Sequence, residues 1–149
     1  MNSYSASFIP YKLIPRKYSS TSPQLSWSKG PENTKSYALM CHDIDVGIIY
    51  WTVYNIPASV TELPEMKNGL EGLPKEVCST TNDNGVIGYS ITRVFDSADN
   101  LSRDKVRTIM FSIYALSDTF QIGLTIREVI PLINDHMVSK TRIIGSINV

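Results

Sequence analysis

The densest group of side chains that could do chemistry in this 149-residue chain lies at 42–47. There His42, Asp43 and Asp45 stand close together in a short acidic connection between two apolar stretches. Successive side chains of an extended segment point to opposite faces, so Asp43 and Asp45 would share one face and His42 would take the other. Two carboxylates could hold a hard cation weakly or act in general acid–base catalysis. An acidic turn that caps its own backbone amides explains the same residues without any ligand.

Signatures of the common enzyme classes do not accompany this segment. The chain has only two histidines, His42 and His136, and no G-x-S-x-G motif, so nothing in the sequence points to a hydrolase triad. It also has no G-x-G-x-x-G motif and no P-loop, which removes support for nucleotide-binding folds. We therefore interpret 41–57 as the wall of a small-ligand pocket. We predict a protein with no catalytic residues, no metal site and no cofactor.

The bulk composition predicts one soluble globular domain over 1–149. Apolar residues make up 42% of the chain, which is ordinary for a protein with a packed core. Basic and acidic residues number 14 each and leave no net charge, which argues against a nucleic-acid partner.

The cysteines and the first residues of the chain bear on its compartment. Cys41 and Cys78 match neither a metal-ligand spacing nor a disulfide framework, so free thiols in a reducing compartment are expected. Residues 1–15 show no signal-peptide pattern, and no stretch approaches the ~20 apolar residues of a membrane span. We expect a cytoplasmic location without stable membrane insertion.

The elements that must position the acidic connection are mainly strands. Runs of β-branched and aromatic residues, bounded by glycine, proline or polar clusters, favour strands over helices. The predicted strands cover 24–28, 36–41, 48–56, 108–116 and 143–149, with a further short candidate at 85–91. Residues 57–84 and 96–107 are predicted loops. Strands at this spacing predict a mostly β fold, a two-sheet antiparallel sandwich.

One helix is predicted near the C-terminal end, where it would pack against the sandwich. Apolar residues recur there at helical spacing: Ile126, Val129, Ile130, Ile133 and Met137. Thr125 and Glu128 fit a capping box at its start. Pro131 conflicts with an unbroken helix, so we expect a short first turn followed by a restart with Pro131 near the first helical position.

Five segments of the chain together resemble one protein family. They have the order and spacing of its patterns S-P-x-L-S-W, K-S-x-A-L, D-P-D-x-P, H-W-x-x-Y-N-I-P and F-x-L-Y-A-L. In this chain they are SPQLSW at 22–27, KSYAL at 35–39, DIDV at 43–46, YWTVYNIPA at 50–58 and FSIYAL at 111–116. The chain is thus similar to the phosphatidylethanolamine-binding protein family, in particular its short bacterial and archaeal branch, also called Raf-kinase-inhibitor-like. The resemblance covers nearly the whole chain.

This resemblance implies a β-sandwich of two antiparallel sheets with a helical element at the C-terminal end. It also implies a small pocket at one end of the sandwich that takes phosphate-like groups, including phospholipid headgroups. Members of the family act as non-enzymatic binding or regulatory proteins, and some inhibit kinases or serine proteases. The resemblance makes a small anion and a kinase or protease the expected partners, and a homodimer the expected assembly.

The chain departs from the family pattern where this pocket should lie. Both prolines of the D-P-D-x-P turn are replaced, and Tyr50 stands in place of the first pocket histidine. Arg107 aligns with the second histidine, and 90–95 (SITRVF) replaces the family loop G-G-P-C-P-P. Tyr50 can donate a hydrogen bond but carries no charge. Arg107 supplies a permanent charge and a forked donor that suits phosphate or carboxylate.

Six residues are candidate ligand contacts by this resemblance. Four match pocket positions of the family, and two in the altered loop could line the mouth of the pocket. They are Asp43, Asp45, Tyr50, Arg107, Tyr89 and Arg93. A second interpretation stays open, in which Asp43 pairs with Arg107 and fills the site, since a buried aspartate needs such compensation. The protein would then act through its surface, as an inhibitor or modulator of a protease or kinase.

Overall fold

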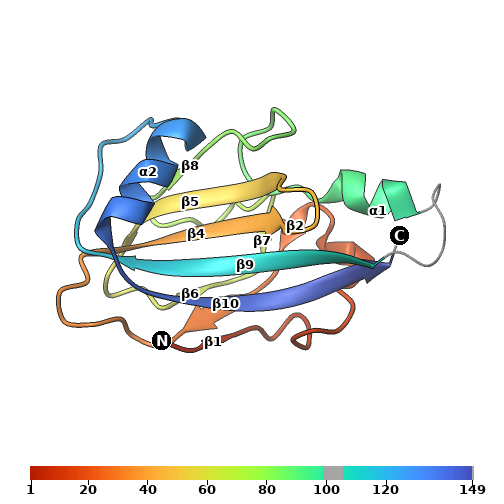
Figure 1. Cartoon of the computed structure of the whole chain (residues 1–149), viewed down its shortest axis with the longest axis horizontal. Coiled ribbons are helices and arrows are strands. Elements are labelled where there is room, and N and C mark those ends of the chain that lie inside the picture. Colours follow the sequence, from red (N-terminus) through yellow and green to blue (C-terminus); the bar gives the residue numbers. More distant parts are fainter. Residues whose placement is uncertain (99–105, 149) are drawn as a thin grey trace.

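The fold is a five-stranded antiparallel sheet with short strands and loops on one face and a helix on part of the other (Figure 1). It was obtained as a computed structural model that describes residues 1–98 and 106–148. In chain order the elements are β1 (Ser3–Tyr4), the 3₁₀ turn η1 (Arg16–Tyr18), β2 (Thr21–Ser22), β3 (Leu25–Trp27), β4 (Ser36–Asp43), β5 (Ile49–Pro57), β6 (Glu62–Leu63), β7 (Met66–Lys67), β8 (Cys78–Ser79), α1 (Thr92–Ala98), β9 (Val106–Leu116), α2 (Ile126–His136) and β10 (Met137–Asn148).

Two layers of strands form the sandwich. The five-stranded sheet has the order β10-β9-β4-β5-β8, and each neighbouring pair in it is antiparallel. Two short sheets face it, one of order β1-β3-β6 and one made of β2 and β7. The mostly β sandwich with a C-terminal helix is therefore confirmed, with its second layer divided into two short sheets.

Alternation along the central strands separates an inner core from an outer face. Side chains of a strand point alternately to its two sides. The inward-facing residues of β4 and β9 are fully buried in the main core: Tyr37, Leu39, Cys41, Ile109, Phe111, Ile113 and Ala115. The outward-facing Ala38, Met40 and Leu116 pack in a smaller cluster with α2. Cys41 and Cys78 are both free thiols, as predicted.

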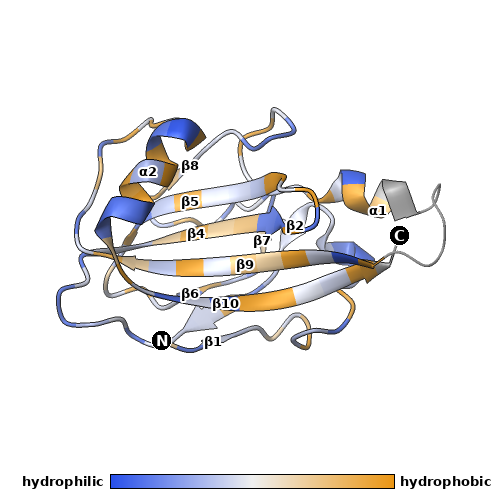
Figure 2. Ribbon diagram, viewed as in Figure 1, coloured by the Kyte–Doolittle hydropathy of each residue, from blue (hydrophilic) through white to orange (hydrophobic). Residues whose placement is uncertain are grey.

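Helix α2 has the predicted capping box but runs through its proline. The backbone N–H of Thr125 donates to Glu128 Oε1 at 3.0 Å. The prediction that the helix restarts at Pro131 is wrong, because α2 is continuous and Pro131 lies exposed within it. Val129 and Ile133, on either side of the proline, are buried against the sheet and hold the helix in place. The helix therefore has one apolar and one polar side (Figure 2).

Two further elements differ from their predictions. Residues 85–91 form no strand beyond a single bridge between Thr81 and Ile87. The final strand begins at Met137 instead of 143, because β9 pairs with β10 along its whole length, from Leu116 to Val106. A strand candidate without a partner stays irregular, whereas one with a long neighbour is extended by it.

The long loops contain more structure than the sequence indicated. Within 57–84 lie the three short strands β6, β7 and β8. Helix α1 includes 96–98, so the first three residues of the predicted 96–107 loop are helical instead. Val94 and Phe95 of this helix are buried in the main core, together with Ile91 just before it. Residues 99–105 of that loop lie outside the described residues, and its last two residues belong to β9. No helix in the described ranges is long and apolar enough to cross a membrane.

Candidate functional site

The acidic connection is a tight turn at one end of the five-stranded sheet. β4 ends at Asp43, and the backbone N–H of Gly47 donates to its carbonyl at 2.8 Å. Gly47 has a φ of 75°, a conformation that favours glycine and lets the chain reverse. A register shift beyond Cys41 leaves Tyr50 as an extra residue of β5, so both Tyr50 and Trp51 are buried in the core.

Asp43 and Arg107 form a direct ion pair at this end of the sheet. The Nε of Arg107 donates to Asp43 Oδ2 at 2.8 Å, and its Nη2 donates to the same oxygen. The Tyr50 hydroxyl donates to Oδ2 at 3.2 Å, and the backbone N–H of Asp45 donates to Oδ1 at 3.0 Å. The Asp43 side chain is 0% exposed and that of Arg107 is 19% exposed. This geometry matches the alternative left open by the sequence, in which Asp43 pairs with Arg107 and the pair fills the site.

Tyr50 and Arg107, the two side chains bonded to the Asp43 carboxylate, both keep their protons and act as hydrogen-bond donors. Burial raises the pKa of Tyr50 above its ordinary value and the charge of Asp43 raises it further, so the hydroxyl stays protonated. Burial lowers the pKa of Arg107, but the hydrogen bonds and charge of Asp43 outweigh this effect and raise it overall. A permanent cation and a neutral donor thus surround one buried carboxylate.

Asp45 stabilises the turn instead of joining the pair. Its Oδ2 accepts a hydrogen bond from the backbone N–H of Thr108 at 2.7 Å, which ties the turn to β9. His42 lines a pocket with side chains of the outer face, so it does not meet Asp43, as alternation predicted. In residues 1–98 and 106–148 no group of three His, Cys, Asp or Glu is placed to hold a metal ion.

The two candidates from the altered loop lie in different surroundings. Tyr89 is 1% exposed, and its hydroxyl donates to the carbonyl of Tyr18 at 2.7 Å. Its ring packs at 5.5 Å from that of Trp51, edge to face, and stacks at 6.4 Å on Phe111. Arg93 is exposed in α1. The structure therefore brings together Asp43, Asp45, Tyr50 and Arg107, while Tyr89 is a core residue and not part of a pocket mouth.

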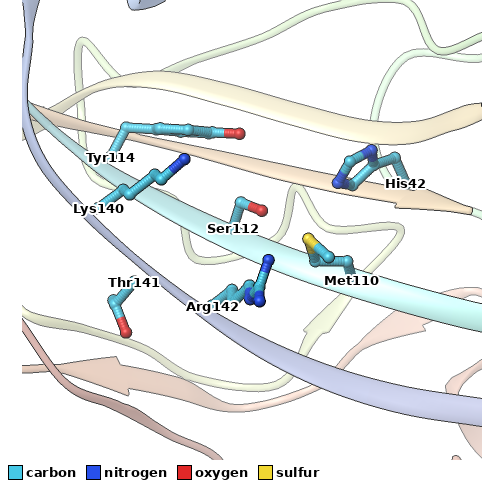
Figure 3. A pocket seen from close by; sticks show the side chains of 7 residues that line it. All are labelled: His42, Met110, Ser112, Tyr114, Lys140, Thr141 and Arg142. Carbon is cyan, nitrogen blue, oxygen red and sulfur yellow. The ribbon is translucent and has the colours of Figure 1, made fainter. Parts of the chain in front are cut away.

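The outer face of the same strands carries a pocket that the sequence did not suggest. Its volume is about 430 Å³, and it is lined by residues of β4, β9 and β10 (Figure 3): His42, Met110, Ser112, Tyr114, Lys140, Thr141 and Arg142. Alternate positions of β9 and β10 supply most of this lining. The pairing register, which a single sequence does not give, sets Lys140 opposite Tyr114 and Arg142 opposite Ser112.

Comparison with known proteins identifies the family that this turn and this sandwich come from. A sequence model described as "Phosphatidylethanolamine-binding protein" matches residues 4–148. The chain belongs to the phosphatidylethanolamine-binding protein family. The resemblance carried by the five short segments is therefore confirmed, and so is the sandwich that it implied.

Solved structures of phosphatidylethanolamine-binding proteins superpose on nearly the whole chain. The structure of Escherichia coli YbcL, described as a new member of the mammalian family, is 26% identical, with a TM-score of 0.85 over 99% of this chain and 98% of that one. A putative homologue from Chlamydia trachomatis is 25% identical, with a TM-score of 0.77 over 99% of this chain and 97% of that one.

Relatives are found in both bacteria and archaea. UPF0098 protein YbcL of E. coli is 39% identical over 102 residues, which are 64% of this chain and 52% of that protein. A UPF0098 protein of Methanothermobacter thermautotrophicus is 29% identical over 97% of both chains. The matched stretch thus spans about half of the E. coli relative. These matches support the bacterial and archaeal branch of the phosphatidylethanolamine-binding proteins, and with it a binding or regulatory protein.

Proposed function

We propose that this chain is a non-enzymatic binding and regulatory protein that acts through protein contacts at the Asp43 end of its sheet. The observation that carries the proposal is the closed ion pair, in which Asp43 is fully buried and bonded to Arg107 and Tyr50. A site filled by the chain's own guanidinium keeps no net charge to attract a small anion. In this proposal, contacts between the protein surface and a protein partner take the place of the phosphate binding that the resemblance implied for this site.

The surface beside the pair suits a protein partner. Ile44 and Val46 in the turn are 45% and 53% exposed, and Val106 at the start of β9 is 54% exposed. The turn is held against β9, because Ile44 N–H donates to the carbonyl of Thr108 at 3.1 Å and Asp45 accepts from the N–H of the same residue. Exposed β-branched side chains on a fixed turn, next to charged groups, match the apolar centre and polar rim of a protein interface.

Inhibition assays test this proposal. The purified protein should inhibit at least one member of a panel of chymotrypsin-like serine proteases and protein kinases at stoichiometric concentration. Ile44→Asp combined with Val46→Asp should weaken that inhibition by about tenfold or more, because it places two charges where the partner would bury apolar side chains.

A matched variant controls for the added charge. Val86→Asp combined with Ile122→Asp changes two exposed apolar residues in other loops and should inhibit as the wild type does. A panel in which no enzyme responds would contradict the proposal, as would an equal loss of inhibition in both double variants.

A second candidate function is the binding of a small anion at the Asp43 site. Arg107 is 19% exposed, and its guanidinium has N–H donors beyond those bonded to Asp43. A phosphate-like anion could bind this outer edge of the guanidinium. Saturable NMR shifts of the Tyr50 and Arg107 amides during a titration with phosphoethanolamine would favour this candidate, and unchanged signals would favour the protein contact.

A further inference from the structure

We propose that the pocket on the outer face of β4, β9 and β10 binds a small phosphate monoester that carries an aromatic or apolar group. This pocket lies apart from the Asp43–Arg107 pair, since His42 and Asp43 are successive residues whose side chains take opposite faces of β4. Its volume of about 430 Å³ lies within the ~300–1,000 Å³ of typical small-molecule sites.

Two cations on one strand supply the attraction for a phosphate. Lys140 and Arg142 stand two positions apart in β10, so their side chains leave the same face of the sheet roughly 7 Å from each other. Both are exposed, and neither has an ion-pair partner in the described part of the chain. Two like charges at this spacing repel each other, and a dianion that contacts both relieves the repulsion.

Hydroxyl groups of β9 lie beside these cations. The register sets Tyr114 opposite Lys140 and Ser112 opposite Arg142, so each hydroxyl-bearing residue neighbours one cation. Figure 3 shows Tyr114 and Lys140 at one end of the pocket, His42 and Met110 at the other end, and Ser112 and Arg142 between them. Phosphate oxygens accept hydrogen bonds from hydroxyls, from ammonium and from the guanidinium fork, so this group of donors suits a phosphate better than a neutral ligand.

The other end of the pocket suits an apolar group. Met110 lies opposite His42 in the pairing of β4 with β9, and its flexible thioether adapts to the shape of an apolar ligand. Burial lowers the pKa of His42, although the charge of Asp43 opposes this, so its ring is neutral near pH 7. A free phosphate would leave this end unused, whereas an ester with an aromatic ring would fill it.

Titration of the full chain with phenyl phosphate tests the assignment. With ¹⁵N-labelled protein at constant ionic strength, the amide signals of Ser112, Tyr114, Lys140 and Arg142 should shift saturably. Binding should be tighter for phenyl phosphate than for inorganic phosphate, because only the ester fills the apolar end. Lys140→Gln combined with Arg142→Gln should weaken binding by about tenfold or more, because two charge-assisted contacts are lost.

The control removes the same charge from another surface. Lys67→Gln combined with Lys75→Gln changes two exposed lysines outside the pocket and should bind phenyl phosphate as the wild type does. Equal weakening in both double variants, or shifts that grow without saturating, would overturn the site. Equal affinity for phenyl phosphate and inorganic phosphate would overturn the choice of an ester. Saturable shifts confined to Asp45 and Tyr50 would overturn the outer-face location.

Discussion

Replacing Arg107 with methionine should lower the free energy of unfolding by about 3 kcal/mol, because it leaves a buried carboxylate without its cation. Asp43 is fully buried and takes two of its hydrogen bonds from this guanidinium. The remaining donors are the Tyr50 hydroxyl and the backbone N–H of Asp45, and neither carries a charge. Chemical denaturation of the wild type and Arg107→Met at pH 7 measures the loss.

Three further variants separate the charge from other effects of this substitution. Arg127→Met removes an exposed arginine from α2 and should change stability by no more than about 0.5 kcal/mol. Tyr50→Phe removes one neutral donor and should cost about 1 kcal/mol. Asp43→Asn in the Arg107→Met background should recover part of the stability, because a neutral amide is cheaper to bury than a carboxylate. A loss below about 1 kcal/mol for Arg107→Met would contradict a strong pair at a buried carboxylate.

Replacing Pro131 with alanine should raise the free energy of unfolding, by an amount approaching the ~3 kcal/mol that separates these residues inside a helix. Pro131 lies within α2, where it cannot donate the backbone hydrogen bond of its turn and where its ring crowds the preceding carbonyl. Its side chain is exposed, so the substitution removes little packing. Thermal and chemical denaturation of Pro131→Ala measure the gain.

A loop proline provides the comparison. Pro74 lies between β7 and β8, and Pro74→Ala should leave stability unchanged or slightly lower, because the unfolded chain gains freedom. If Pro131→Ala lowers stability instead, the backbone geometry that the proline imposes is needed for Val129 and Ile133 to pack on the sheet, and the account of α2 is wrong.

Strands with strong local signals could be predicted from the sequence. Those at 36–41, 48–56 and 108–116 are dense in β-branched and aromatic residues, and β4, β5 and β9 occupy these positions. Helix α2 was placed by its apolar spacing and its capping box. The proline prediction failed because two buried contacts outweigh the local cost of Pro131, and contacts of this kind are set by the fold and not by the segment.

The candidate site was predictable where the family pattern fixes a position. Asp43 and Arg107 meet because the register between β4 and β9 sets the end of β4 beside the start of β9. The sequence left their pairing open as one of two interpretations. Tyr89 could not be placed from its loop, since its burial depends on Trp51 and Phe111 of distant strands. The outer-face pocket depends on the register between β9 and β10, which no local pattern encodes.

His42 and Asp43 connect the outer-face pocket with the buried Asp43–Arg107 pair. They are neighbours in β4, yet one lines the outer-face pocket and the other lies in the buried pair. A ligand on the outer face would therefore lie close to the end of β4, where the turn that carries Ile44 and Val46 begins. A cytoplasmic location and a homodimer, both expected from the sequence, stay predictions.

The Nε–H signal of Arg107 in a ¹H–¹⁵N correlation spectrum tests the closed site most directly. Because this hydrogen is bonded to Asp43 at an N–O distance of 2.8 Å, it should exchange with water far more slowly than the Nε–H of exposed Arg127. The signal should also stay in place while phosphoethanolamine is added. Exchange as fast as that of Arg127, or a saturable shift with the ligand, would show an open anion site and contradict the account.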